Sequence, residues 1–131
     1  MTKKLFLLTF VMFLFSMGAT AVSAQWEDLG SREVKDRSEQ DTWHITAARG
    51  QFRKIKLAVS RRPVRFYKVE ITYTNGEKDN VEIRSVIPAG GETRAIDLRG
   101  NDRFLSKVDI WYEAASAGRG RRSTVTLWGF K

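Results

Sequence analysis

Apolar and polar residues alternate along most of the chain, and this period of two is typical of strands that bury one face. No stretch shows a sustained 3.6-residue apolar period with helix caps, so the pattern predicts an all-β fold. The clearest alternating segments are 55–59, 69–73, 81–83, 96–98, 108–112 and 125–127, and weaker ones are 32–35 and 42–47.

Turn-forming residues separate these segments. Asn75-Gly76 is a strong hairpin signal, because both residues tolerate a positive φ. About eight short strands with regular turns predict a single antiparallel β-sandwich, of jelly-roll or Ig-like type, with a small barrel as the alternative.

One segment changes its apolar phase. Val64 and Phe66 occupy even positions, whereas the apolar residues from Val69 onward occupy odd ones. A bulge near Tyr67-Lys68 would let both groups face the same core.

The first 24 residues have the three parts of a secretory signal peptide. Lys3 and Lys4 precede an apolar run at 5–17, and Val22-Ser23-Ala24 fits the small-x-small rule for cleavage. The run is shorter than the roughly 20 residues that span a bilayer. The sequence therefore predicts a signal peptide at 1–24, a single domain at 25–131 with no transmembrane segment, and an exported protein, periplasmic or extracellular.

The charge balance favours acidic partners. The formal net charge is +8, and loss of the two signal lysines would leave +6. Anionic glycans, lipid head groups and acidic proteins suit such a domain, whereas nucleic acid is a less natural partner for an exported chain.

Catalytic chemistry has little support in the sequence. The chain has no cysteine and one histidine, His44, and nothing marks a particular serine as a nucleophile. No loop has the acidic spacing of a calcium site. We therefore expect no enzyme activity, cofactor or metal, with a hydrolase using Asp97 or His44 as a distant alternative.

A cationic surface is the first candidate for binding. Arg119, Arg121 and Arg122 lie in a Gly-containing loop, and Arg61 and Arg62 lie at the turn before Pro63. Arginine suits bidentate contact with phosphate, sulfate or carboxylate. Ordinary solvation of charged loops is the simpler interpretation.

An aromatic surface is the second candidate. If the last two strands paired with each other, Trp111 and Trp128 would lie diagonally on one face, where they could stack on sugar rings. Alternatively, that face is buried by a loop, by the Trp26 segment or by a second copy of the chain.

The pattern of the later strands resembles a known group of proteins. The run 93–108, the following Asp109-Ile110-Trp111-Tyr112 and the final 125–129 are similar to the YaaI-like periplasmic proteins, as are Leu29-Gly30 and 55–57. The resemblance implies a bacterial exported β-sandwich, and it implies no activity.

Taken together, these features predict a non-catalytic domain that binds an anionic or glycan ligand of the bacterial envelope. The alternative is a structural module that interacts with another envelope protein.

Overall fold

The chain is described by a computed structural model that covers residues 25–34, 39–115 and 122–131. This part contains nine strands and one short 3₁₀ helix, η1. Their bounds are β1 (Trp26–Val34), β2 (Glu39–His44), η1 (Ala47–Arg49), β3 (Gln51–Phe52), β4 (Lys54–Ser60), β5 (Val64–Tyr73), β6 (Lys78–Ile87), β7 (Ile96–Asp97), β8 (Arg103–Ala114) and β9 (Ser123–Phe130).

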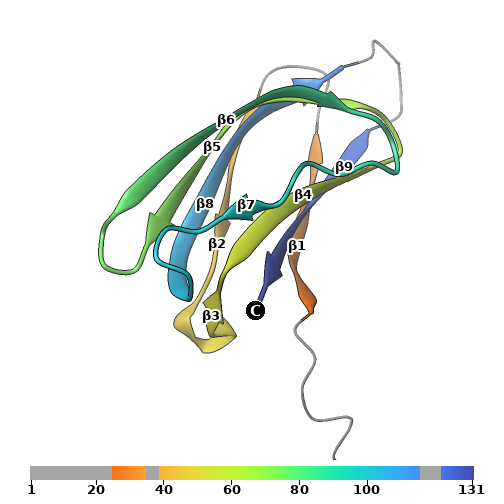
Figure 1. Cartoon of the computed structure of the whole chain (residues 1–131). Helices are drawn as coiled ribbons and strands as arrows, with labels where there is room; N and C mark the ends of the chain where they lie inside the picture. The colour runs from red at the N-terminus through yellow and green to blue at the C-terminus, as the bar shows by residue number, and fades with distance from the viewer. Residues whose placement is uncertain (1–24, 35–38, 116–121) are drawn as a thin grey trace, which may run out of the picture.

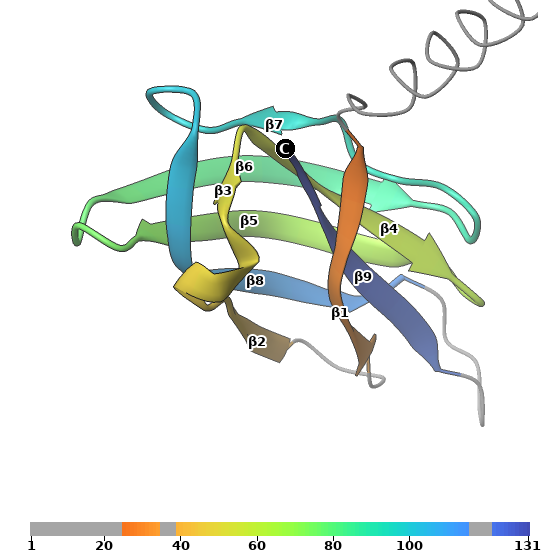
Figure 2. The ribbon, with the colours of Figure 1, turned by 90° about the horizontal axis from the view of Figure 1, so that it is seen from below.

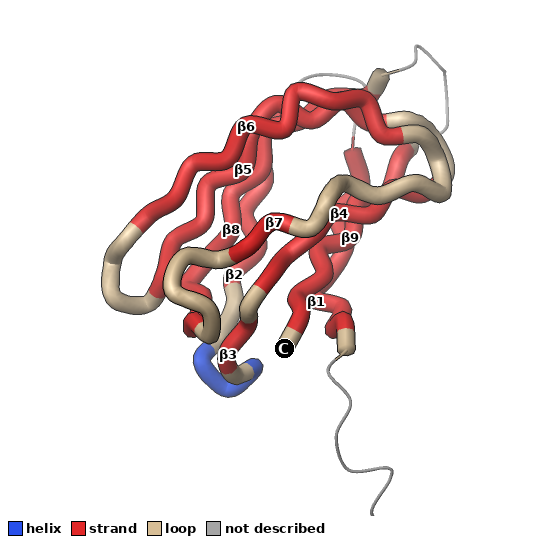
Figure 3. The backbone as a smooth tube through the Cα atoms, in the orientation of Figure 1, coloured by secondary structure: helices blue, strands red, loops and turns tan. Residues whose placement is uncertain are grey.

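The strands form two antiparallel sheets that face each other (Figure 1). Sheet A has the order β1-β9-β4-β7, and sheet B has the order β2-β8-β5-β6, with β3 also paired to β8. Seen from below, β4 and β9 cross the strands of sheet B at an angle (Figure 2). Strands dominate the described backbone, and η1 lies at one end beside β3 (Figure 3). The predicted antiparallel sandwich is confirmed, and the barrel alternative is not formed.

The core lies between the sheets and is built from the predicted alternation. In β9 every second residue from Ser123 to Gly129 is buried, and β4 buries Ile55, Leu57 and Val59. Aromatic rings fill the space between these rows. Those that are almost fully buried are Trp43, Phe52, Phe66, Tyr73 and Tyr112. Since the chain has no cysteine, burial of apolar surface has to hold the sheets together.

The chain changes sheets at Phe52. This residue belongs to β3, which pairs with sheet B, whereas β4 begins two residues later in sheet A. The Phe52 ring packs against Gly129, where an added Cβ would lie 2.6 Å from the Phe52 Cδ1 and 2.9 Å from the Leu29 Cδ1. Only glycine leaves room for the ring at this corner.

The supposed pairing of the last two strands is wrong. β8 lies between β2 and β5 in sheet B, and β9 lies between β1 and β4 in sheet A. Eight residues, 115–122, separate the two strands, which is longer than the usual hairpin connection of two to five residues. Trp111 and Trp128 therefore lie in different sheets.

The hairpin and the bulge are both confirmed. β5 and β6 pair around Asn75-Gly76, where Gly76 has a φ of +92°. The register of β5 shifts between Phe66 and Lys68 against both of its neighbours.

Replacing Gly129 with alanine should lower the free energy of unfolding by about 1–3 kcal/mol, because the Phe52 ring has to move away from the new methyl group. Chemical denaturation measures this change. Thr124→Val, on the outer face of the same strand, is the control and should stay within about 0.5 kcal/mol of the parent. Equal losses in the two variants would contradict the packing at the corner.

Candidate functional site

At the bulge, neighbouring strands of sheet B use different numbers of residues to cover the same length of sheet. The number rises from β8 to β5 and again from β5 to β6. It is two residue steps in β8, three in β5 and four in β6, counted from Tyr112 to Ile110, Phe66 to Val69 and Ser85 to Val81. Extra residues of this kind bend a strand and redirect side chains, and bulges are common beside functional sites.

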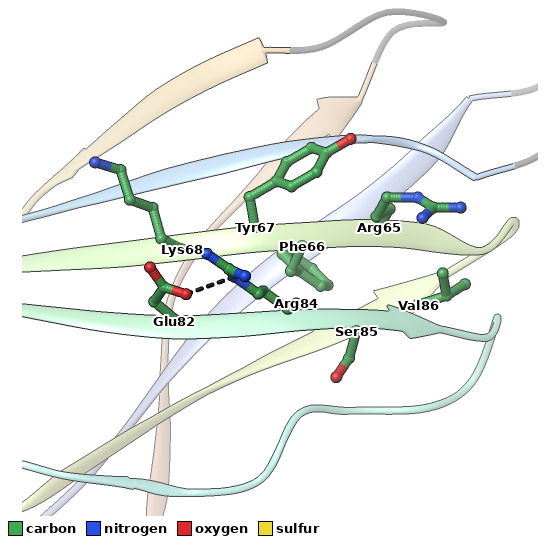
Figure 4. A pocket seen from close by; sticks show the side chains of 8 residues that line it. All are labelled: Arg65, Phe66, Tyr67, Lys68, Glu82, Arg84, Ser85 and Val86. Atoms are coloured by element: carbon green, nitrogen blue, oxygen red, sulfur yellow. Dashed lines mark ion pairs between the residues drawn. The ribbon is translucent and has the colours of Figure 1, made fainter.

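A hollow of about 480 Å³ lies at this bulge (Figure 4). We call it the bulge hollow. Its lining residues come from β5 and β6 only and are Arg65, Phe66, Tyr67, Lys68, Glu82, Arg84, Ser85 and Val86. Phe66 points into the core, whereas Tyr67 and Lys68 extend from β5 toward β8. Tyr67 and Val86 are 40% and 47% exposed, which is unusual for large apolar side chains.

Three cations and one carboxylate line the bulge hollow. Arg84 has a φ of +47°, a backbone conformation that non-glycine residues seldom adopt. Its Nε lies 2.5 Å from Glu82 Oε2, and both side chains are mostly exposed. The strained backbone thus holds an accessible guanidinium at Glu82, in the same hollow as Tyr67.

The bulge hollow continues onto β8 through two contacts. Lys68 Nζ lies 4.2 Å from the ring centroid of Trp111, a cation–π arrangement. Arg65 Nε lies 3.6 Å from Glu113 Oε1. The exposed outer face of sheet B therefore brings aromatic and cationic groups together across β5, β6 and β8.

The hydroxyl of Tyr67 donates a hydrogen bond to Glu113. This bond raises the pKa of Tyr67 above its ordinary value, with smaller contributions in the same direction from burial and from the Glu113 charge. The tyrosine therefore stays protonated, and its ring position is fixed by β8.

Beside Trp111, a polar network surrounds the buried Asp109. Gln40 Nε2 donates to Asp109 Oδ1 over 3.0 Å, and Thr42 donates to the same oxygen. Lys107 Nζ lies 3.7 Å from Asp109 Oδ2. Because the Asp109 carboxylate is satisfied in this way, we assign it a role in holding β2 against β8 rather than in binding.

The predicted arginine surface is brought together in part. Arg61 Nη1 and Arg122 Nη1 lie 3.7 and 3.3 Å from the two carboxylate oxygens of Glu33. Arg62 is adjacent, since its carbonyl accepts a hydrogen bond from Ser123 Oγ over 2.8 Å. Arg119 and Arg121 lie outside the described residues, so their part of the hypothesis stays a prediction.

Trp128 lies on the outer face of sheet A, whereas Trp111 belongs to β8 in sheet B. Its cross-strand neighbours are Asp28 on β1 and Lys56 on β4. The next row along the sheet holds Trp26 and Phe130, whose ring centroids are 5.1 Å apart. We call Trp26, Trp128 and Phe130 the sheet A strip.

The two residues of the hydrolase alternative lie in different sheets, His44 in β2 and Asp97 in β7. His44 is exposed at the end of β2, and Asp97 is exposed in β7. Among the described residues, no three His, Cys, Asp or Glu side chains are grouped so as to hold a metal ion.

No described helix is long and apolar enough to cross a membrane.

Comparison with known families decides the classification. The profile of one family, described as "Domain of unknown function (DUF2541)", matches residues 6–129, which is most of the chain. The chain belongs to the DUF2541 family. None of the curated proteins matches it.

The solved structures that are similar to this DUF2541 chain include the following two. One is AlgX of Pseudomonas aeruginosa, with a TM-score of 0.50 and 20% sequence identity over 83% of this chain and 27% of AlgX. This chain thus corresponds to about a quarter of AlgX, and the likeness concerns the fold alone. The other is the SPBc2 prophage-derived protein YomS, with a TM-score of 0.42 and 15% identity over 86% of this chain and 100% of YomS.

Sequence reasoning missed the cations and the tyrosine of the bulge hollow. The phase change between Phe66 and Val69 was the signal that could have found them. When two inward residues are three positions apart, both residues between them can face outward. Here they are Tyr67 and Lys68, and the partner strand adds Arg84.

Glu113→Gln should lower the pKa of Tyr67 toward the ordinary tyrosine value of 10.0, because it removes the carboxylate that accepts the hydrogen bond of the tyrosine hydroxyl. An alkaline absorbance titration measures the three tyrosines, and Tyr67→Phe identifies the signal. Glu70→Gln is the control, since Glu70 pairs with Lys78 instead. An unchanged Tyr67 titration in Glu113→Gln would refute the contact.

Proposed function

We propose that this protein is a non-catalytic module that binds an anionic glycan in the bulge hollow. The observation that carries the proposal is that Arg65, Lys68 and Arg84 line the same hollow as the exposed Tyr67. The fold alone would not support it, because β-sandwiches serve many functions.

The ion pairing of the bulge hollow favours exchange with an external anion. Glu82 is the one carboxylate among the lining residues, and its pair with Arg84 is exposed to solvent. Exposed pairs contribute little free energy, typically about 0–1 kcal/mol. A carboxylate or sulfate of a ligand can therefore replace Glu82 at the guanidinium with little loss, and Lys68 adds a second positive charge.

The aromatic rings favour a sugar rather than a free ion. Tyr67 is held by Glu113, and Trp111 lies beyond Lys68 on the same face. Rigid rings offer contact area at low entropic cost. A sugar ring that lies on Tyr67 would place its acidic substituents close to the cations.

A second candidate for anion binding is the arginine cluster at Glu33. Its support is the convergence of Arg61 and Arg122 on one carboxylate, with Arg62 adjacent. Among the described residues, no aromatic ring forms a cation–π contact with these three arginines, so the cluster fits a phosphate-bearing lipid head group better than a glycan. Its described arginines are a matched control for the bulge hollow.

We further propose that the domain acts outside the cytoplasm, in the periplasm or beyond it. The basis is the signal-like segment at 1–24 and the likeness to YaaI-like periplasmic proteins. The family description assigns no function, so the ligand class rests on the residues of the site.

The test compares two triple variants that lose the same charge. Changing Arg65, Lys68 and Arg84 to alanine should weaken binding of dextran sulfate or polygalacturonate about tenfold or more, because charge-assisted contacts are lost. Changing Arg61, Arg62 and Arg122 to alanine should have a much smaller effect. Isothermal titration calorimetry at two salt concentrations measures both, and binding should weaken as salt rises.

Three results would contradict the proposal. Equal losses in the two variants would mean that net charge alone attracts the polymer. Binding of uncharged dextran as strong as that of dextran sulfate would exclude a role for the cations. Preferential binding of phosphatidylglycerol vesicles, lost in the Arg61, Arg62 and Arg122 variant, would move the function to the arginine cluster.

A further inference from the structure

Sheet B has an open edge, which is formed by β6. This strand is the outermost of the sheet, and in the described part of the chain no strand pairs with its outer side (Figure 3). The opposite edge is covered by β1, because Arg32 Nη2 donates to the Thr42 carbonyl of β2 over 3.2 Å. An open strand is a template for pairing with another chain.

The register between β5 and β6 shows which backbone groups of this edge point outward. Tyr73 N donates to Glu77 O over 2.9 Å, and in an antiparallel pair such bonds fall on every second residue. The next bonds to β5 therefore fall on Asp79 and Val81. The backbone N–H and C=O groups that point outward belong to Lys78, Asn80 and Glu82.

The side chains of these three residues are also exposed. Lys78 Nζ lies 3.6 Å from Glu70 Oε1, and Glu82 Oε2 lies 2.5 Å from Arg84 Nε. Ion pairs that are open to solvent contribute little free energy. Lys78 and Glu82 can therefore exchange these partners for charges on an added chain.

The other acidic groups beside the edge are already held. Asp79 accepts a hydrogen bond from Tyr73 Oη over 2.7 Å and pairs with Arg99. Arg99 Nη1 also lies 3.7 Å from Glu77 Oε2. The segment 78–82 thus offers one exposed cation and one exposed anion to an added chain.

This segment is complementary to itself in one antiparallel register. Two-fold pairing centred on Asn80 sets Lys78 of each copy opposite Glu82 of the other. The registers centred on residues 78, 79, 81 and 82 set like charges opposite each other, namely Lys78 and Lys78, Asp79 and Asp79, Lys78 and Arg84, and Glu82 and Glu82. Opposite charges across a strand pair stabilise it, and like charges destabilise it. A lysine ordinarily protects an edge from pairing, but in the register about Asn80 it is neutralised.

We infer that β6 is an interaction surface for a second copy of this chain, paired antiparallel about Asn80. The same segment serves both copies, so the pairing closes on itself and gives a dimer rather than a fibre. Its two-fold axis is perpendicular to the sheet, and the outer faces of sheet B in the two copies lie on the same side. The dimer goes beyond the proposed function, because it needs no ligand.

Pairing changes the bulge hollow, and this consequence alone rests on the proposed function. When Glu82 turns to Lys78 of the second copy, it leaves the Arg84 guanidinium to an external anion. The two hollows then face the same side, where one polymer chain can reach both. Two linked sites bind a polymer more tightly than a single site does.

Charge reversal tests the register. Sedimentation equilibrium of the protein without ligand should show a monomer–dimer equilibrium. Lys78→Glu and Glu82→Lys should each weaken it about tenfold or more, although they change the net charge in opposite directions, and the two reversals combined should restore it. Trp128→Ala, in the sheet A strip, is the control and should leave the dimer unchanged.

A single introduced thiol locates the centre of the pairing, since the chain has no cysteine. Asn80→Cys sets two thiols in a hydrogen-bonded pair, whose Cα atoms lie about 5.5 Å apart and within the range of a disulfide. Mild oxidation should link this variant much faster than Ser85→Cys, which is exposed on the same strand. The linked dimer should bind dextran sulfate at least about tenfold more tightly than the reduced protein.

A protein that stays monomeric, or thiols at 80 and 85 that link equally fast, would overturn the inference. So would a dimer that both single reversals leave intact, or one that Trp128→Ala abolishes, because the copies would then meet at another surface. Equal affinity of the linked and reduced proteins for dextran sulfate would refute the shared use of the two hollows. Loss of all dextran sulfate binding beside an intact dimer would refute the proposed function alone.

Discussion

The arrangement of sheet B depends on one extra residue in β5. Phe66 and Val69 both face the core, although three positions separate them. The strand accommodates this spacing by turning Tyr67 and Lys68 to the same outer side, and β6 follows with a further residue at Arg84. The bulge that keeps both Phe66 and Val69 in the core therefore also places the Tyr67 ring and the charged Lys68 on the same outer side. The proposed binding site and the packing of the core therefore depend on the same bulge.

Much of the fold could be predicted because period-two alternation reports directly on burial. The rows at 55–59, 69–73, 108–112 and 125–127 all have the predicted inward faces. Pairing partners were harder to predict, because alternation says which side of a strand is apolar but not which strand lies beside it. The supposed contact between β8 and β9 failed for this reason. Both strands bury an apolar face, and the glycine-containing connection at 115–122 does not identify the neighbour of either strand.

For the candidate sites too, the sequence predicted which way a side chain faces but not which residues lie near it. Trp111 and Trp128 do face outward, as their positions relative to buried neighbours implied, but they belong to opposite surfaces. Arg61 and Arg122, distant in sequence, lie near each other because β4 pairs with β9, and both contact Glu33 on β1. No sequence pattern marked Arg84 as a candidate. It reaches the bulge hollow only through the pairing register of β6 with β5, which the sequence of one strand does not reveal.

The position of β9 has a consequence for the order in which the fold can form. This strand lies near the C-terminal end of the described chain, yet it is central in sheet A, paired on both sides with β1 and β4. Those partners precede it by roughly 70 to 100 residues, so sheet A is built from non-local contacts and is expected to assemble slowly. Neither β1 nor β4 can complete its pairing until residues 123–130 have been synthesised. A chain truncated before β9 would lose both halves of sheet A together and expose the apolar face of sheet B.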